Sequence, residues 1–162
     1  MNSESLVIDL VHLVKEKKAL MSNLLELTIT QGKLILEDED DISRIQVVID
    51  EKQKLMKVID NIDFEFLDKL DELKRLLNIK TLDSLKEEPV KGFRELKQEI
   101  QDIIKLTEEL KQLDEANTQK AKANLDKVKE QLKVINVGKK ASNSYSTNKY
   151  QQGQSILIDK KK

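Results

Sequence analysis

The sequence predicts an all-α protein, an elongated antiparallel bundle of three long helices with one short connecting helix and a disordered C-terminal tail. Three observations support this fold class. Apolar residues recur at steps of three and four over three long segments, which is the spacing of one helix face. Charged residues make up 36% of the 162 residues and aromatic residues 3%, as is typical of long helices with much exposed surface. Four glycines and one proline leave few positions that break a helix.

The first predicted helix begins after Ser3 or Ser5, because either hydroxyl can cap a helix N-terminus. Weak helix formers gather between Thr28 and Gly32, so its last turns are expected to fray or bend. Its inward positions alternate in steps of four and three, the spacing of a coiled-coil face. They are Leu6, Leu10, Leu13, Lys17, Leu20, Leu24, Leu27, Gln31 and Leu34.

An acidic run from Glu37 to Asp41 follows this helix. We interpret it as a solvated turn whose last acid caps the next helix and complements its dipole. A calcium loop would need a turn glycine and a late bidentate glutamate, and the segment from Ile42 to Ile49 supplies neither.

The second predicted helix runs from about Ile42 to Leu77. Phe64, Phe66 and Leu67 broaden its apolar face, and we interpret them as core filling because no polar groups converge around them as in a cofactor pocket. The opposite face carries Lys, Asp and Glu. The inward stripe consists of Ile45, Ile49, Lys52, Met56, Ile59, Ile62, Phe66, Leu70, Leu73 and Leu77.

A corner connects the second and third long helices. Asn78 is the expected C-cap, and Thr81 is the expected N-cap of a short helix from Leu82 to Glu88 that ends at Pro89. Gly92 then permits a turn. Short connections of this kind make the long helices antiparallel neighbours.

The third predicted helix runs from Phe93 to Ile135, about 43 residues and roughly 65 Å at 1.5 Å per residue. Small or polar residues at Asn117, Ala121 and Asn124 weaken its middle, which is expected to bend or open. The other inward positions are Leu96, Ile100, Ile103, Leu110, Leu113, Leu125, Val128, Leu132 and Ile135.

The third helix is longer than the first two, which are expected to span about 45 and 54 Å. The excess is expected at its C-terminal end, where the chain offers few residues to cover the apolar stripe. An uncovered stripe on a helix is a partner site or an oligomer seam. We therefore predict that the stripe binds amphipathic helices of a client, with the client-binding residues Leu125, Val128, Leu132 and Ile135.

The composition changes after this helix and divides the chain into a helical domain, residues 1–136, and a flexible basic tail, residues 137–162. The tail is rich in Ser, Asn, Gln and Lys, and six lysines against one aspartate give it a charge of about +5. Tyr145, Tyr150 and the triplet Ile156–Ile158 provide spaced anchors, as in a docking peptide.

Several function classes find no support in the sequence. The single histidine, His12, has no cysteine or second histidine to join it and is expected at the surface or an interface, so we predict no metal site, no cofactor and no enzyme activity. The net charge of −1 gives no general footprint for nucleic acid. The chain shows no signal peptide and no apolar run near the ~18 residues of a membrane span, so stable membrane insertion is not expected and the protein is predicted to be cytoplasmic.

Four stretches of the sequence together resemble those of a known protein family. They are residues 41–56, which open the second helix, residues 79–85 with Pro89 downstream, residues 110–117, and residues 150–161 in the tail. With the order of the elements, the corner and the tail, they resemble the FlgN family of flagellar export chaperones over nearly the whole chain.

The resemblance implies a cytoplasmic chaperone for the two hook–filament junction proteins. Such chaperones hold the C-terminal helices of their clients, prevent premature association and deliver them to the flagellar type III export gate. The family assigns client binding to the C-terminal helical region, and a tail tyrosine to docking on the cytoplasmic domain of the gate. Tyr145 and Tyr150 are the candidates for that docking role.

The main alternative is a structural protein, either a coiled-coil adaptor or a self-associating bundle whose exposed stripe is a homodimer seam. A tight dimer that hides the third helix would favour this alternative. Nucleic-acid binding through the basic tail is a third class, and it would require binding that falls steeply with salt.

Overall fold

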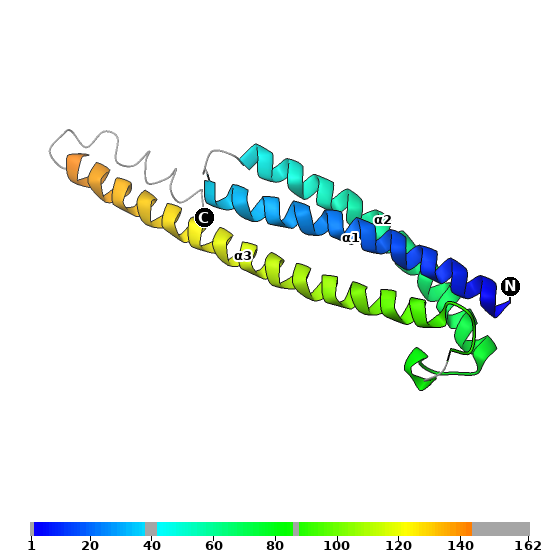
Figure 1. The fold of residues 1–162 in the computed structure, drawn as a ribbon. Helices are drawn as coiled ribbons and strands as arrows, with labels where there is room; N and C mark the ends of the chain where they lie inside the picture. Colours follow the sequence, from blue (N-terminus) through cyan, green and yellow to red (C-terminus); the bar gives the residue numbers. More distant parts are fainter. Residues whose placement is uncertain (1, 38–41, 86–87, 144–162) are drawn as a thin grey trace. The chain divides into compact units, whose positions relative to one another are not determined.

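Three long α-helices and one short 3₁₀ helix form the secondary structure of the described residues (Figure 1). The computed structural model describes residues 2–37, 42–85 and 88–143. Helix α1 spans Ser3–Glu37, α2 spans Ile42–Leu77, η1 spans Leu82–Ser84 and α3 spans Phe93–Asn143. The predicted all-α class with three long helices is confirmed. The chain divides into two compact units, residues 1–120 and 121–162.

Asn2 caps α1, whereas the sequence pointed to Ser3 or Ser5. The Oδ1 atom of Asn2 accepts a hydrogen bond from the backbone N–H of Ser5 at 2.8 Å. Its backbone carbonyl accepts a second from the N–H of Leu6 at 3.1 Å. Asparagine is as good an N-cap as serine, and the helix begins directly after it, at Ser3.

Helix α2 ends in a Schellman motif at Asn78. The backbone of Asn78 is left-handed, with φ of 52°. The N–H of Ile79 donates to the carbonyl of Lys74 at 3.0 Å, and the N–H of Asn78 donates to that of Arg75 at 3.2 Å. These bonds satisfy carbonyls that the end of the helix leaves free. The predicted bounds of this helix and its predicted C-cap are confirmed.

The corner between α2 and α3 contains η1 and a glycine turn. Thr81 is the N-cap of η1 as predicted, but η1 covers only Leu82–Ser84 instead of extending to Glu88. The hydroxyl of Thr81 pairs with that of Ser84 at 2.8 Å instead of capping a backbone N–H. Gly92 has φ of 89°, and a Cβ there would lie 3.1 Å from Cγ1 of Val7. Glycine suits this turn because it adopts a positive φ without strain and because it has no Cβ to press against Val7.

The core of residues 1–120 is formed by all three long helices, and α1 and α2 are the most closely packed pair. One cluster lies around the first half of α1 and contains Leu6, Val7, Leu10, Val11, Val14, Leu70, Leu73 and Leu96. A second cluster follows further along α1 and contains Met21, Leu24, Ile59 and Leu110. Most of the predicted inward positions of α1 and α2 therefore lie in or beside the core.

Three predicted core residues of α2 are instead exposed. Phe66 packs against the first cluster as predicted, but Phe64 is 80% exposed, Leu67 58% and Met56 50%. At about 100° per residue, Phe64 lies on the side of the helix opposite to the buried stripe, and Leu67 lies about a quarter turn from its middle. Core filling by Phe64 and Leu67 was therefore a wrong prediction, as was the inward position of Met56.

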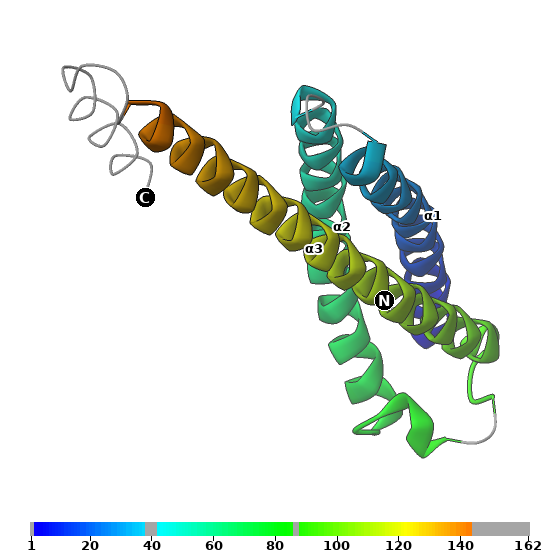
Figure 2. The same ribbon diagram turned by 90° about the vertical axis from the view of Figure 1, so that its left-hand side faces the viewer.

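Ion pairs between helices show the up-down-up order of residues 1–120. Between α1 and α2, Asp9 pairs with Lys69 and Lys17 pairs with Asp63, so the two helices are antiparallel. Between α1 and α3, pairs and contacts advance along both helices in the same direction. Figures 1 and 2 show α1 and α2 side by side. The corner that contains η1 lies at the end where α1 begins. The predicted antiparallel arrangement is confirmed.

Lysines at predicted inward positions are satisfied by partners on neighbouring helices. The Nζ atom of Lys52 on α2 donates to Gln31 of α1 at 3.0 Å and to Asp114 of α3 at 2.9 Å. The Lys52 side chain is 13% exposed. It therefore joins all three long helices, and a lysine in an otherwise apolar stripe is explained by these two acceptors.

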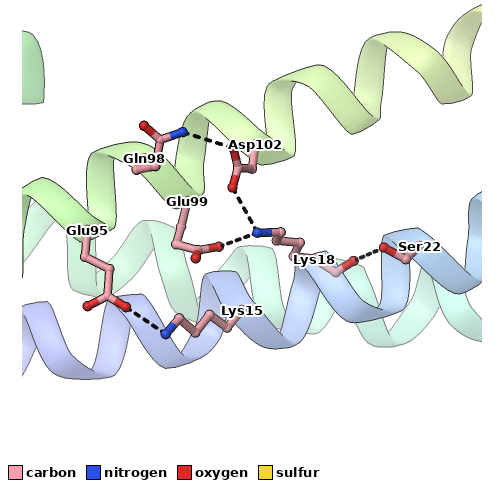
Figure 3. A network of polar contacts seen from close by, with 7 residues as sticks. All are labelled: Lys15, Lys18, Ser22, Glu95, Gln98, Glu99 and Asp102. Atoms are coloured by element: carbon pink, nitrogen blue, oxygen red, sulfur yellow. Dashed lines mark hydrogen bonds and ion pairs between the residues drawn. The ribbon is translucent and has the colours of Figure 1, made fainter.

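A polar network joins α1 to α3 (Figure 3). The Nζ atom of Lys18 donates to Asp102 at 2.9 Å and to Glu99 at 3.2 Å, and Lys15 pairs with Glu95 at 2.7 Å. The hydrogen bond to Asp102, followed by that to Glu99, raises the pKa of Lys18. Hydrogen bonds from Lys18 and then Gln98 lower the pKa of Asp102. Both shifts mean that folding favours the charged forms of Lys18 and Asp102.

Asn117 of α3 forms a buried polar contact with α1. Its Nδ2 donates to the carbonyl of Thr28 at 2.9 Å, and the two residues are 6% and 0% exposed. A Cβ at Gly32 would lie 2.5 Å from Oδ1 of Asn117, so the glycine leaves room for this side chain. The weak helix formers of α1 therefore serve a contact, and α1 continues through them to Glu37. The sequence suggested that Asn117 leaves α3 with little to bury, but the side chain is buried against α1.

Helix α3 extends further than predicted. Its start at Phe93 agrees with the prediction, but it ends at Asn143, eight residues after Ile135. Gly138 and the polar residues around it indicated a tail, yet no proline interrupts this segment and polar residues are compatible with an exposed helix. The remaining part of the predicted tail, residues 144–162, lies outside the described residues.

Candidate docking surface on the third helix

The C-terminal part of α3 exposes the apolar residues that the sequence predicted to bind a client. Leu125 is 54% exposed, Leu132 51% and Ile135 54%. Val128 is half-buried. We call these four residues the client stripe. Each step between them is three or four residues, so at about 100° per residue they lie within about a quarter of the helix circumference.

The client stripe repeats the spacing by which the earlier part of α3 packs. Leu96, Leu110 and Asn117 are buried at separations of 14 and 7 residues, whole numbers of heptads that keep them on the same side of the helix. From residue 121 onward, none of the side chains that the structure describes is buried. Apolar side chains with core-like spacing but with half their surface exposed are typical of a face that another helix covers.

Lysines lie beside the client stripe. At about 100° per residue, Lys122, Lys129 and Lys133 fall along one edge of it. Lys133 forms a long ion pair with Glu130 at 3.8 Å, and both side chains are about three-quarters exposed. Exposed pairs of this kind contribute little to stability. The lysines are therefore available to acidic side chains on a docked helix.

Two further exposed apolar residues of α3 were not predicted. Val134 is 70% exposed and Val137 66%. Around the helix, Val134 lies about 140° from the middle of the client stripe and Val137 about 160°. No periodic signal marks them, and Val137 fell in the segment interpreted as tail. Both valines are more exposed than the residues of the client stripe and do not share their spacing.

Other predicted features lie elsewhere on the chain. His12 is exposed, as predicted. Tyr145 and Tyr150 lie outside the described residues, and so does most of the acidic run, residues 38–41. Within the described ranges, no group of His, Cys, Asp or Glu side chains could hold a metal ion. None of the helices described is both long enough and apolar enough to cross a membrane.

The surface beside η1 is polar. A hollow of about 150 Å³ is lined by Leu85, Glu88, Phe93, Arg94, Lys97, Gln98 and Gln101. Apolar and aromatic walls, which dominate most small-molecule sites, are a minority here. Among the described features, the client stripe is therefore the strongest candidate for a functional surface.

A helical bundle with an unburied stripe of this kind defines the class: an all-α protein with an exposed apolar helix face. The comparison with protein families then gives the family. The family model described as FlgN protein matches residues 1–153, and the chain belongs to this family. The FlgN family is a family of flagellar export chaperones that bind flagellar export substrates. Neither the curated proteins nor the solved structures contain a match to the chain.

Proposed function

We propose that this protein is a cytoplasmic chaperone that holds the C-terminal helices of hook–filament junction proteins and delivers them to the flagellar export gate. The exposure of the client stripe is the observation that carries the proposal. Leu125, Leu132 and Ile135 keep the spacing of a packed face while more than half of each side chain meets solvent. Family membership supports export substrates as the clients.

The client helix is proposed to lie along the client stripe with its own apolar residues at steps of three and four. Burying a leucine side chain completely contributes about 1.5–3 kcal/mol. Several such contacts offset the cost of immobilising the client. Acidic residues beside the client's apolar face would meet Lys122, Lys129 and Lys133, which favours this orientation over others.

The proposal is tested by changing both Leu125→Ser and Leu132→Ser in the full chain. Binding of a synthetic C-terminal helical segment of a junction protein is measured by calorimetry. The double variant should bind about a hundredfold more weakly, because two buried leucines together contribute roughly 3 kcal/mol or more. Far-UV circular dichroism should show that the helix content is retained.

Val134→Ser with Val137→Ser is the matched control. It removes two apolar side chains of similar exposure from the same helix, but off the client stripe. This control should bind the segment as the unchanged chain does. Equal losses in both double variants, or full binding by the leucine variant, would contradict the proposed site.

Delivery is proposed to depend on Tyr145 and Tyr150, which would dock on the cytoplasmic domain of the export gate. Both tyrosines lie within the part of the chain that the family model matches. Tyr145→Ala and Tyr150→Ala, made separately, should identify the docking residue by loss of binding to the purified gate domain. Client binding should be unchanged, because neither tyrosine belongs to the client stripe.

A coiled-coil adaptor or homodimer remains the alternative function, because an exposed stripe also suits self-association. Light scattering distinguishes the two. If the unchanged chain is a dimer and the leucine double variant is a monomer, and neither binds the client segment, then the client stripe is a dimer seam and the chaperone site is rejected.

A further inference from the structure

A second exposed apolar surface lies on α2, in the other unit of the chain. Phe64 is the most exposed large hydrophobic residue among those described, at 80%, and Leu67, one turn later, is 58% exposed. Neither packs against the core clusters of residues 1–120. Burial in the bundle therefore does not explain an aromatic and an aliphatic side chain at these positions.

Three aspartates frame this surface. Asp60 and Asp68 lie one turn before and one turn after Phe64, and Asp71 lies one turn after Leu67. At about 100° per residue, all five residues fall within about 100° of the helix circumference. We call these five residues the acidic face. Lys57 and Arg75 fall in the same sector, one turn before Asp60 and one turn after Asp71, and Lys74 lies beside it. On this side of the helix, the three aspartates are the charged residues nearest to the two apolar side chains.

The aspartates of the acidic face differ from Asp63 and Glu65, two other carboxylates of α2. Asp63 pairs with Lys17, and Glu65 lies 3.7 Å from Lys69. No salt bridge or side-chain hydrogen bond within the described residues is formed by Asp60, Asp68 or Asp71, and all three residues are exposed. Their charges therefore do not serve to hold the bundle together.

The acidic face continues into a hollow at the end of α2. The hollow has a volume of about 700 Å³ and is lined by Asp68, Asp71, Lys74, Arg75, Asn78, Ile79 and Lys80. It arises because the Schellman motif at Asn78 turns the chain back beside the helix. Two aspartates of the acidic face line this hollow together with three basic residues, Lys74, Arg75 and Lys80, so the acidic character is confined to the part of the face around Phe64 and Leu67.

We propose that the acidic face is a second docking surface, which binds an amphipathic helix of another protein whose apolar residues are flanked by Lys or Arg. Phe64 and Leu67 supply the apolar contacts, and aromatic anchors are the residues that contribute most at interfaces. The aspartates, which form no ion pair with any described residue, select a basic partner. Their charge also repels phosphate backbones and anionic lipid, so a protein helix is favoured over nucleic acid or a membrane.

The charge of the acidic face separates this inference from the proposed client site. The client stripe has lysines beside it, whereas the acidic face has aspartates. A helix that complements one surface brings like charges to the other, and like-charge contacts exclude wrong partners. The acidic face is therefore proposed to take a different partner from the client stripe.

The test uses the full chain with Leu125→Ser and Leu132→Ser, which disable the client stripe, because the lysines beside that stripe would otherwise bind the acidic control peptide. The ligand is a fluorescein-labelled synthetic helix with Leu at steps of three and four and Lys on both sides of the Leu stripe. The same peptide with Glu in place of Lys is the control ligand. We expect the Lys peptide to bind and the Glu peptide to bind at least about tenfold more weakly. Failure of the Lys peptide to bind, or equal binding of both peptides, would overturn the proposal.

Three variants locate the binding. Phe64→Ser with Leu67→Ser should lower the affinity for the Lys peptide by about tenfold or more. The triple change of Asp60, Asp68 and Asp71 to Asn should lower this affinity and make it depend less on salt concentration. Val47→Ser with Leu76→Ser removes two exposed apolar residues from another part of α2 and should have no effect. Equal loss in this control, or no loss in the first variant, would overturn the proposal.

Two other occupants give distinct outcomes. A second copy of the chain is indicated if Phe64→Ser with Leu67→Ser changes the molar mass measured by light scattering. The chain's own basic tail is indicated if changing its lysines to Gln raises the affinity for the Lys peptide at least about tenfold. Either result would overturn docking of a foreign helix. Unchanged mass and unchanged affinity in these experiments would support it. The tail lysines changed are Lys149, Lys160, Lys161 and Lys162.

Discussion

Asn117 and Gly32 illustrate how two residues that weaken helices can stabilise a bundle. Each counts against helix formation when read alone, and the sequence therefore suggested fraying in one helix and a weak section in another. In the structure, Nδ2 of Asn117 donates to the carbonyl of Thr28, and Gly32 leaves the space that its Oδ1 occupies. The contact joins residues that are 89 positions apart in sequence, so no local pattern could reveal it.

Gly32→Ala should lower the free energy of unfolding. The new Cβ would lie 2.5 Å from Oδ1 of Asn117. Because the Asn117 side chain is buried and hydrogen-bonded to Thr28, moving it costs about 1–3 kcal/mol, against a gain of up to about 1 kcal/mol from alanine in a helix. Gly138→Ala is the control, because a Cβ there meets nothing within 4 Å. It should stabilise the chain slightly. Urea unfolding measures both changes, and equal stabilisation by the two would contradict the steric argument.

Asn117→Ala should partly rescue Gly32→Ala. The alanine at position 117 frees the space that the new Cβ needs, although it also removes the hydrogen bond to Thr28. The double variant should therefore lose less stability than the sum of the single variants, with a coupling of about 0.5–3 kcal/mol. Strict additivity in urea unfolding would show that the two positions do not interact.

Asp102 and Lys18 make stability depend on pH at the two extremes. The pKa of Asp102 is lowered from its usual 3.8, so its contribution is present above that pH and is lost as the pH falls through the lower folded value. The pKa of Lys18 is raised from its usual 10.5, so its contribution is present below that pH and is lost as the pH rises through the higher folded value.

Asp102→Asn should therefore be less stable than the unchanged chain at neutral pH, with a difference that shrinks as the pH falls below 3.8. Urea unfolding at several pH values measures the difference. Asp126→Asn is the control, because no salt bridge to Asp126 occurs in the described part of the chain. A difference for Asp102→Asn that stays constant down to about pH 2 would contradict the role of this ion pair.

At the scale of the elements, the long helices were predictable and their ends less so. The limits of α2 were readable because an acidic run precedes it and Asn78 follows it. The end of α3 was missed because its last turns have no apolar residues at helical spacing. The absence of proline was the only feature of the sequence compatible with a longer helix. The outward position of Phe64 was missed because a broad apolar run does not show which of its residues faces the core.

The two parts of α3 should differ in their local stability. Residues 93–120 pack against the other helices through buried Leu96, Leu110 and Asn117, whereas no described side chain after residue 120 is buried. In proteins most of the stability of a helix comes from tertiary packing of its apolar face. Backbone amides of residues 121–143 should therefore exchange with deuterium faster than those of residues 93–120, and binding of a client segment should slow them. Equal protection in the two parts without a client would contradict this prediction.

At the scale of the whole molecule, the sequence identified one functional surface and missed the other for the same reason. Periodicity finds apolar residues that continue an inward face, so it found the client stripe. It assigns every nearby apolar residue to that face, so it placed Phe64 and Leu67 in the core. Only the observed exposure, together with three aspartates that make no described ion pair, separates the acidic face from the bundle interior.

The client stripe and the acidic face should bind their ligands independently. They lie in different units of the chain, share no residue and carry opposite flanking charges. A ligand changes the affinity of a second site only through a difference in the conformations it selects, and the acidic face belongs to a part of the chain with a packed core of its own. The affinity for the Lys-flanked peptide should therefore change by less than about twofold when a client segment saturates the stripe. Titration of one labelled ligand in the presence of the other measures this. Mutual exclusion of the two ligands would show that they compete for one surface, and a strong mutual enhancement would show that binding at the stripe reorganises the bundle.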